Sequence, residues 1–200
     1  MFVNMENSTR KSSRKENKSK EGDARLSFGG GFIRKKRVLS VVTILMLLFT
    51  NPVLSQAKSY KAPWNNGFKS YEDAHCITNS RKLPQGKLKR KYVLSKYGVY
   101  TVNGRYCIAV GSYYSKKVGT KMDLVLRDNG KNRVLKCILA DCKADQDTNK
   151  THQVHKGDGS IVEFVVQTGA LPRRAAYITG DVSDAGRPFR GRIIKIKVYR

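Results

Sequence analysis

The sequence predicts a mainly β protein, a small closed barrel preceded by a short helical piece and by a signal or anchor segment. Three observations lead to this expectation. From about residue 91 onward the chain has short runs of alternating apolar and polar residues, Asn-Gly dipeptides between such runs, and few helical stretches. Five or six short strands separated by turns in about 110 residues are typical of a small barrel.

The N-terminal part leads from a basic region into an uncharged apolar run. Residues 38–49, VLSVVTILMLLF, follow the basic stretch RKKR and end before Asn51-Pro52, which does not continue a helix easily. The run has the length of a signal peptide and is short for a membrane-spanning helix, which needs roughly 20 residues. A buried core helix is the remaining alternative.

A small-x-small triplet, Ser55-Gln56-Ala57, follows the apolar run and is of the kind that a signal peptidase cleaves. We therefore expect residues 1–57 to be an export signal. Uncleaved, the chain would contact the membrane through residues 38–54, with the basic end in the cytoplasm. Either version makes the protein secreted or exposed on the extracellular face of the membrane.

The charge of the chain predicts its partners. The formal net charge is +25, and residues 58–200 carry 29 Lys and Arg against 11 Asp and Glu, so the excess is not confined to the tail. Such a field favours nucleic acid, anionic lipid or an anionic wall polymer. Export argues against nucleic acid, so we expect peptidoglycan or anionic wall polymers as partners. The oligomeric state is left open.

Four cysteines follow the apolar run, and an exported chain meets an oxidising environment. They are Cys76, Cys107, Cys137 and Cys142. Two bridges in three connectivities are compatible with this number, although a bridge from Cys137 to Cys142 would close a very small loop. Free, buried thiols are the alternative.

Residues 58–89 are predicted to be a linker with a short helix. The stretch PWNNG at 63–67 is typical of a turn, and FKSYEDAHCI at 68–77 places Phe68, Tyr71 and either Ala74 or His75 at helical spacing.

Residues 90–200 are predicted to form the barrel domain. The runs GVYTV and RYCIAVG flank Asn103-Gly104, and MDLVL and RVLKCILA flank Asp128-Asn129-Gly130, so each pair predicts a hairpin. SIVEFVV and GRIIKIKVYR predict two more strands, with at most one short helix between them.

Two acidic residues are candidate catalytic groups because of their places on predicted strands. Asp141 follows the apolar end of one strand, and Glu163 lies inside another. Two carboxyls that share a cleft can cleave a glycosidic bond, and a lytic transglycosylase can manage with one, because a hydroxyl of the sugar replaces water. The alternative is that Asp141, Asp145 and Asp147 only cap turns.

Two other chemistries remain open. Cys142, beside Asp141, could be a nucleophile, but nothing in the sequence fixes a histidine near it. No closed zinc pattern is present either, so we expect no metal and no cofactor. The residues considered as zinc ligands are His75, Cys76, Cys137, Cys142, His152 and His155.

The stretch GRYCIAVGSYYSKKVGTKMDLVL, followed by CILADCKADQDT, GSIVEFVV and GDVS, resembles an uncharacterised family of exported proteins from Gram-positive bacteria. The order of parts over residues 90–200 also resembles the double-psi β-barrel of rare-lipoprotein-A-like and 3D domains. Ala109, VGTKMDLVL, CILAD and IVEFVV match that order. The resemblance implies a six-stranded barrel with a polar groove.

In this resemblance Asp141 takes the place of the acid at the strand end, and Glu163 stands where an Asp is expected. The family includes peptidoglycan-cleaving lytic transglycosylases, so the resemblance implies glycan-strand cleavage with Asp141 as general acid and base, assisted by Glu163 and Asp145. Two alternatives stay open: a wall-binding or wall-remodelling module without catalysis, and a component of a surface assembly.

Overall fold

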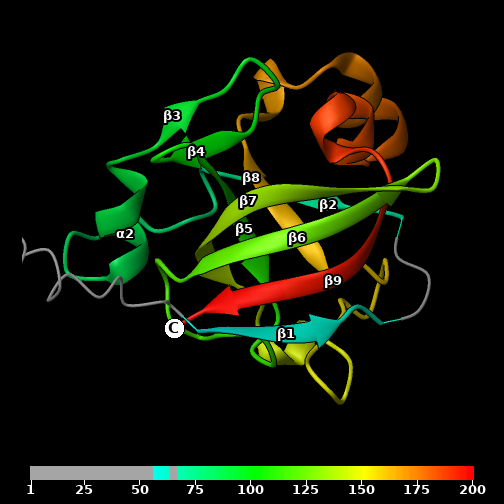
Figure 1. Ribbon diagram of the computed structural model, residues 1–200. Helices are drawn as coiled ribbons and strands as arrows, with labels where there is room; N and C mark the ends of the chain where they lie inside the picture. The colour runs from blue at the N-terminus through cyan, green and yellow to red at the C-terminus, as the bar shows by residue number, and fades with distance from the viewer. Residues whose placement is uncertain (1–55, 64–66) are drawn as a thin grey trace, which may run out of the picture. The chain divides into compact units, whose positions relative to one another are not determined.

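The computed structural model describes residues 56–63 and 67–200, and the predicted signal or anchor segment lies outside these residues. The described chain is mainly β, as predicted, and forms one mixed sheet of nine strands (Figure 1). The strands are β1 (Ala57–Lys61), β2 (Ser70–Asp73), β3 (Val93–Leu94), β4 (Tyr100–Val102), β5 (Arg105–Val110), β6 (Lys121–Asp128), β7 (Lys131–Cys142), β8 (Val162–Val166) and β9 (Arg192–Tyr199). No helix in this part of the chain is long and apolar enough to cross a membrane.

The sheet follows the order β1-β9-β6-β7-β5-β4-β3, and β8 pairs with both β5 and β2. Most neighbours are antiparallel, whereas β5 with β7 and β2 with β8 are parallel. One side of β5 is shared, because β4 pairs with its first residues and β8 with its last ones. The sheet thus contains more strands than the predicted barrel of six.

Both predicted hairpins are present, and both turn at Asn-Gly. Asn103 and Gly104 have φ of 50° and 71°, and Asn129 and Gly130 have φ of 47° and 77°. The flanking residues pair directly, so each turn has two residues. Positive φ at both central positions is the geometry that matches the twist of a hairpin and that Asn-Gly tolerates best.

The helix predicted at residues 68–77 is wrong, because this stretch forms the strand β2 and a turn. β2 pairs in parallel with β8, and its Tyr71 packs against the larger core cluster. The strand ends at Asp73, whose Oδ1 accepts the amide hydrogen of His75 over 2.9 Å. Pairing with a distant buried strand has overridden the helical spacing.

Helical structure occurs elsewhere. The helix α2 spans Pro84–Lys89, with proline in the first turn, where its missing N–H costs nothing. We expected at most one short helix between β8 and β9, and this prediction is also wrong. The connection contains several short helical turns, seen at the upper right of Figure 1. They are Thr168–Ala170, Ala175–Thr179, Val182–Ala185 and Arg187–Phe189.

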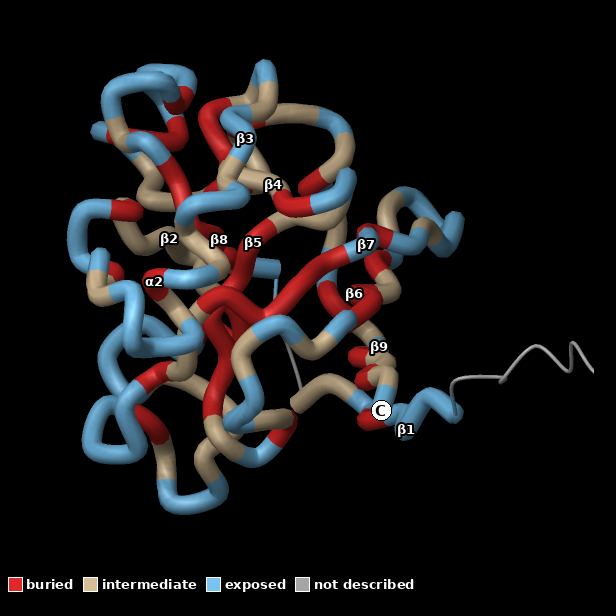
Figure 2. The backbone as a smooth tube through the Cα atoms, turned by 90° about the vertical axis from the view of Figure 1, so that its left-hand side faces the viewer, coloured by how far each residue is buried: buried red, intermediate tan, exposed pale blue. Residues whose placement is uncertain are grey.

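Consecutive residues are buried along β5 and β7 (Figure 2), so these strands bury side chains on both faces of the sheet. The larger cluster includes Ile108, Val110, Leu139, Phe164 and Phe189. The smaller cluster, on the other face, contains Ala74, Ile77, Val102, Cys107, Ile138, Ala140 and Val165. Neighbouring residues of β5 and β7 alternate between the two clusters, as the two-residue period of a strand requires.

Candidate acid pocket

A polar cavity of about 290 Å³ lies where β2, β5, β7 and β8 meet. We call it the acid pocket. Four of its lining residues are acidic, although the chain as a whole is strongly basic. Its lining consists of Glu72, Ala109, Asp141, Cys142, Lys143, Ala144, Asp147, His155 and Glu163. The structure therefore brings Asp141 and Glu163, which are 22 residues apart in the chain, into one hollow.

The sheet register explains why these two acids meet. Ala109 of β5 pairs with Asp141 of β7 on one side and with Glu163 of β8 on the other. The methyl group of Ala109 is the only side chain between the two carboxyls along this row. A small residue at the centre of the row leaves space above the sheet for a ligand.

A β-bulge turns the Asp141 side chain toward the face of the sheet on which the acid pocket lies. Ile108 pairs with Leu139, but the next residue, Ala109, pairs with Asp141, so Ala140 is the extra residue of β7. Ala140 packs in the smaller cluster and Asp141 lines the pocket, so two consecutive residues use the same face of the sheet. Without the bulge, the alternation of the strand would turn Asp141 toward the larger core cluster.

Glu163 is held by a buried lysine. Its Oε1 lies 2.9 Å from Nζ of Lys143, and the two side chains are 19% and 1% exposed. The same Nζ donates to the carbonyl oxygen and the hydroxyl oxygen of Ser160 over 3.0 and 2.9 Å. The ammonium group therefore has three partners, which a buried charge requires. Burial lowers the pKa of Lys143, and the charge of Glu163 opposes that effect.

Glu72 is the acid that the sequence analysis did not single out. It lies on β2, one residue from Tyr71, and points to the opposite face of the sheet from that core tyrosine. Burial raises its pKa to about 7, and the nearby charges of Asp141 and Glu163 add to this effect. The positive charge of Lys143 lowers the pKa of Glu72 and so opposes these effects. Near neutral pH the pocket thus contains a carboxyl that can both hold and release a proton.

Asp141 is positioned by the backbone and by α2. Its Oδ1 accepts the amide hydrogen of Cys142 over 2.9 Å and lies 3.4 Å from Nε2 of Gln85. Gln85 belongs to the first turn of α2, so that helix contacts the Asp141 carboxylate, although no residue of α2 lines the pocket itself. The short helix therefore serves to hold the side of the pocket at which β7 ends.

Asp145 lies outside the acid pocket, although the sequence analysis grouped it with Asp141 and Glu163. Its Oδ1 accepts a hydrogen bond from Oγ of Ser112 over 2.5 Å, and its Oδ2 lies 3.6 Å from Nζ of Lys116. The hydrogen bond from Ser112 lowers the pKa of Asp145, with smaller contributions from His152 and Lys116. Its geometry is that of a link between two surface loops.

The residues considered as zinc ligands do not converge. His152 contacts Thr148 and Asp145, and His155 contacts Asp158. Within residues 56–63 and 67–200, no group of three or more His, Cys, Asp or Glu side chains is arranged to hold a metal ion.

All four cysteines are free thiols in the structure. Cys107 and Cys137 sit on neighbouring strands but pack on opposite faces of the sheet. Burial is the main cause that raises the pKa of Cys142, and its Sγ lies 3.7 Å from the carbonyl oxygen of Ser115. A thiol in that state is a poor nucleophile.

The pocket thus combines the elements of acid–base chemistry: a carboxyl with a pKa near 7, a second carboxyl at a strand end, and a third that is paired with an ammonium group. A group with a pKa near the working pH is best suited to donate and accept protons. Comparison with known protein families, curated proteins and solved structures finds no match to this chain. These comparisons therefore add no support to the resemblance to double-psi barrels, which was stated on sequence motifs.

Proposed function

We propose that this chain is an exported, envelope-associated protein that cleaves glycan strands of peptidoglycan in the acid pocket. One observation carries the proposal: Glu72, with a pKa of about 7, shares a cavity with Asp141 and Glu163. Cleavage of a glycosidic bond needs an acid that protonates the leaving oxygen and a carboxylate that supports the positive charge at the ring. The cavity volume lies close to the lower limit of roughly 300 Å³ for small-molecule sites.

In the proposed reaction, Glu72 gives its proton to the glycosidic oxygen while the bond from that oxygen to the anomeric carbon breaks. A hydroxyl group of the same sugar forms the new bond to the anomeric carbon, and its proton passes to the carboxylate of Asp141. Proton transfer from Asp141 back to Glu72 restores the starting state. Glu163, held by Lys143, supplies negative charge near the oxocarbenium-like ring.

The exported location and the barrel form part of the same proposal. The apolar run at residues 38–49 and the triplet that follows support export. The two parallel strand pairs within a mixed sheet support a double-psi-like topology, in which closure of the sheet would complete the barrel.

The test is release of soluble fragments from purified peptidoglycan by the full chain, followed by mass analysis of the products. We expect Glu72→Gln and Asp141→Asn each to lower the rate by about 10²- to 10⁴-fold, the usual contribution of a general acid or base. Fragments that carry an internal anhydro bond, and no added water, would identify the sugar hydroxyl as the attacking group.

Asp145→Asn is the matched control, because it neutralises an acid of the same region outside the pocket. It should keep the rate within about twofold, since surface contacts of this kind contribute little. Undiminished release by both Glu72→Gln and Asp141→Asn would overturn the proposal.

A wall-binding module without catalysis is the second candidate, and a separate basic groove near the C-terminal end of β9 favours it. In that case insoluble peptidoglycan would retain the wild type, Glu72→Gln and Asp141→Asn equally, and none of them would release fragments. A component of a surface assembly would show no affinity for wall material at all.

A further inference from the structure

A second cavity, of about 900 Å³, lies at the end of the sheet where β1 begins and β9 ends. In Figure 1 these two strand ends lie side by side, next to the start of β6. The loop from β5 to β6 forms the remaining wall. We call this cavity the basic groove, and it is lined by Lys58, Tyr60, residues 112–121 and residues 198–200. It shares no lining residue with the acid pocket.

The side chains of the groove carry only positive charge. No Asp or Glu lines it, and five basic residues do: Lys58, Lys116, Lys117, Lys121 and Arg200. Lys117 and Lys121 are exposed and form no ion pair within residues 56–63 and 67–200. Lys116 pairs with Asp145 at 3.6 Å, but the two side chains are 73% and 47% exposed, so this pair is weak. The groove therefore attracts a polyanion.

Three tyrosines make one wall of the groove rigid. Tyr60, Tyr113 and Tyr114 contact one another edge to face, with ring centroids 5.2 to 5.5 Å apart. Tyr60 and Tyr114 are buried, whereas Tyr113 is 47% exposed. Nζ of Lys58 lies 4.9 Å from the centroid of the Tyr60 ring, which orients this cation along the wall. One open aromatic face beside several cations suits a sugar or polyol that carries phosphate.

The number of open rings favours such a polymer over nucleic acid. Binding of single strands depends on several aromatic rings, on which successive bases stack. Among the tyrosines that line the groove, Tyr60 and Tyr114 are buried in its wall, so their rings are not open to a base. The hydroxyl of Tyr199 donates to Asp123 over 2.6 Å, which holds that side chain in place. The hydroxyl groups of Ser112 and Thr120 already donate to Asp145 and to the carbonyl oxygen of Lys117, so the lysine ammonium groups supply the contacts to phosphate oxygens.

We propose that the basic groove binds the phosphodiester chain of a polyol- or sugar-phosphate polymer. Its volume exceeds the needs of a single phosphate, and its cations come from three separate chain segments, β1, the β5–β6 loop and the end of β9. The inference deepens the proposed envelope function and rests on it only for the source of the polymer. Binding in the groove does not depend on cleavage in the acid pocket.

The test uses the full chain in detergent and measures binding of a poly(glycerol phosphate) oligomer over a range of salt concentrations. The variant is Lys117→Gln with Lys121→Gln. We expect about tenfold weaker binding and a slope of log K against log salt that is smaller by about 1 to 2, as for the loss of two phosphate contacts.

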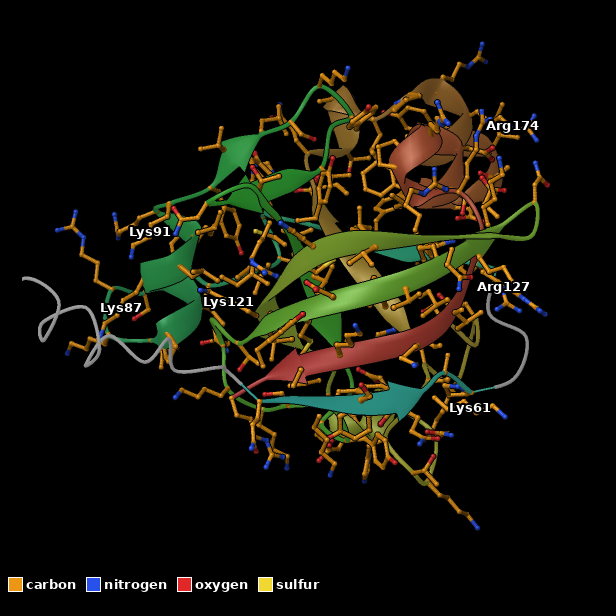
Figure 3. The ribbon with its side chains drawn as sticks, viewed as in Figure 1. Lys61, Lys87, Lys91, Lys121, Arg127 and Arg174 are labelled. Carbon is orange, nitrogen blue, oxygen red and sulfur yellow. The ribbon has the colours of Figure 1, made fainter. Side chains whose placement is uncertain are left out.

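The matched control is Lys61→Gln with Lys195→Gln, which removes the same charge from two exposed lysines that face each other in the β1–β9 ladder outside the groove. Figure 3 shows Lys61 and Lys121 at opposite ends of the sheet. The control should change the affinity less than about twofold at moderate salt, where distant charges are screened. An equal loss in both variants would mean diffuse attraction and would overturn the site.

Three further probes identify the source of the phosphodiester: single-stranded DNA of equal charge, inorganic phosphate, and vesicles with phosphatidylglycerol. Weaker binding of all three than of the polymer supports the proposal. Preference for DNA, for vesicles or for free phosphate would overturn it in favour of that ligand. If the Lys117 and Lys121 variant lost binding while Glu72→Gln and Asp141→Asn both released fragments at the wild-type rate, the groove would stand and the proposed catalysis would fail.

Discussion

Replacement of Glu72 by Gln tests the electrostatics of the acid pocket without any substrate. The pKa of Glu72 is about 7 in the folded protein, against an ordinary 4.5. Between these values the folded state holds a proton that the unfolded state has lost, so the stability of the wild type falls as the pH rises from 4.5 to 7. The difference corresponds to at most about 3 kcal/mol, and solvent screening of this half-buried side chain reduces it to about 1–2 kcal/mol.

Glutamine has nearly the same shape and does not ionise. The variant should therefore match the wild type near pH 4.5 and exceed its stability by about 1–2 kcal/mol at pH 8. Urea denaturation at several pH values gives both curves. Asp145→Asn is the control, because the lowered pKa of Asp145 places its titration below this pH window. Parallel curves for the wild type and Glu72→Gln from pH 4.5 to 8 would refute the raised pKa.

Three other substitutions have clear expected outcomes. Lys143→Met should destabilise the fold by about 3 kcal/mol in urea denaturation, because it leaves Glu163 without its cation, and should move the titration of Glu72 to higher pH. Lys69 is fully buried and donates to three oxygens, and burial lowers its pKa from 10.5 to about 8. Between pH 8 and 10.5 the unfolded state therefore binds a proton that the folded state has lost, so the stability of the wild type should rise over this range. Lys69→Met should lose that slope and about 2–4 kcal/mol at pH 7, while an unchanged slope would contradict this assignment. Tyr114→Phe should stabilise the protein by about 1 kcal/mol in thermal melts, because the Tyr114 hydroxyl is buried without a partner in the described residues; a loss of stability would point to a partner.

The parts of the fold that depend on local signals were predictable. The two Asn-Gly turns, the strands beside them and the alternation of β9 follow from the conformational tolerance of two residues and from a period of two. β2 was not predictable in this way. Its ladder joins it to β8, about 90 residues further along the chain, and no local pattern specifies such a partner.

The acid pocket was predictable only in part, for related reasons. Asp141 and Glu163 were visible as acids at the end of one strand and inside another. Glu72 was missed because its stretch was assigned to a helix; as a strand, its alternation with Tyr71 would have placed it on the opposite face from the core. Lys143 gave no signal, because one lysine among 40 basic residues cannot be recognised as buried from the sequence.

The bulge at Ala140 has a consequence for folding as well as for the site. Regular alternation of the same residues would turn the Asp141 carboxylate into the larger core cluster, whose members are all uncharged. Deletion of Ala140 would instead leave Asp141 opposite Ala109 in a regular ladder and keep it on the pocket face. The one extra residue therefore lets a long hydrophobic strand end in a charged group without placing that charge in the interior.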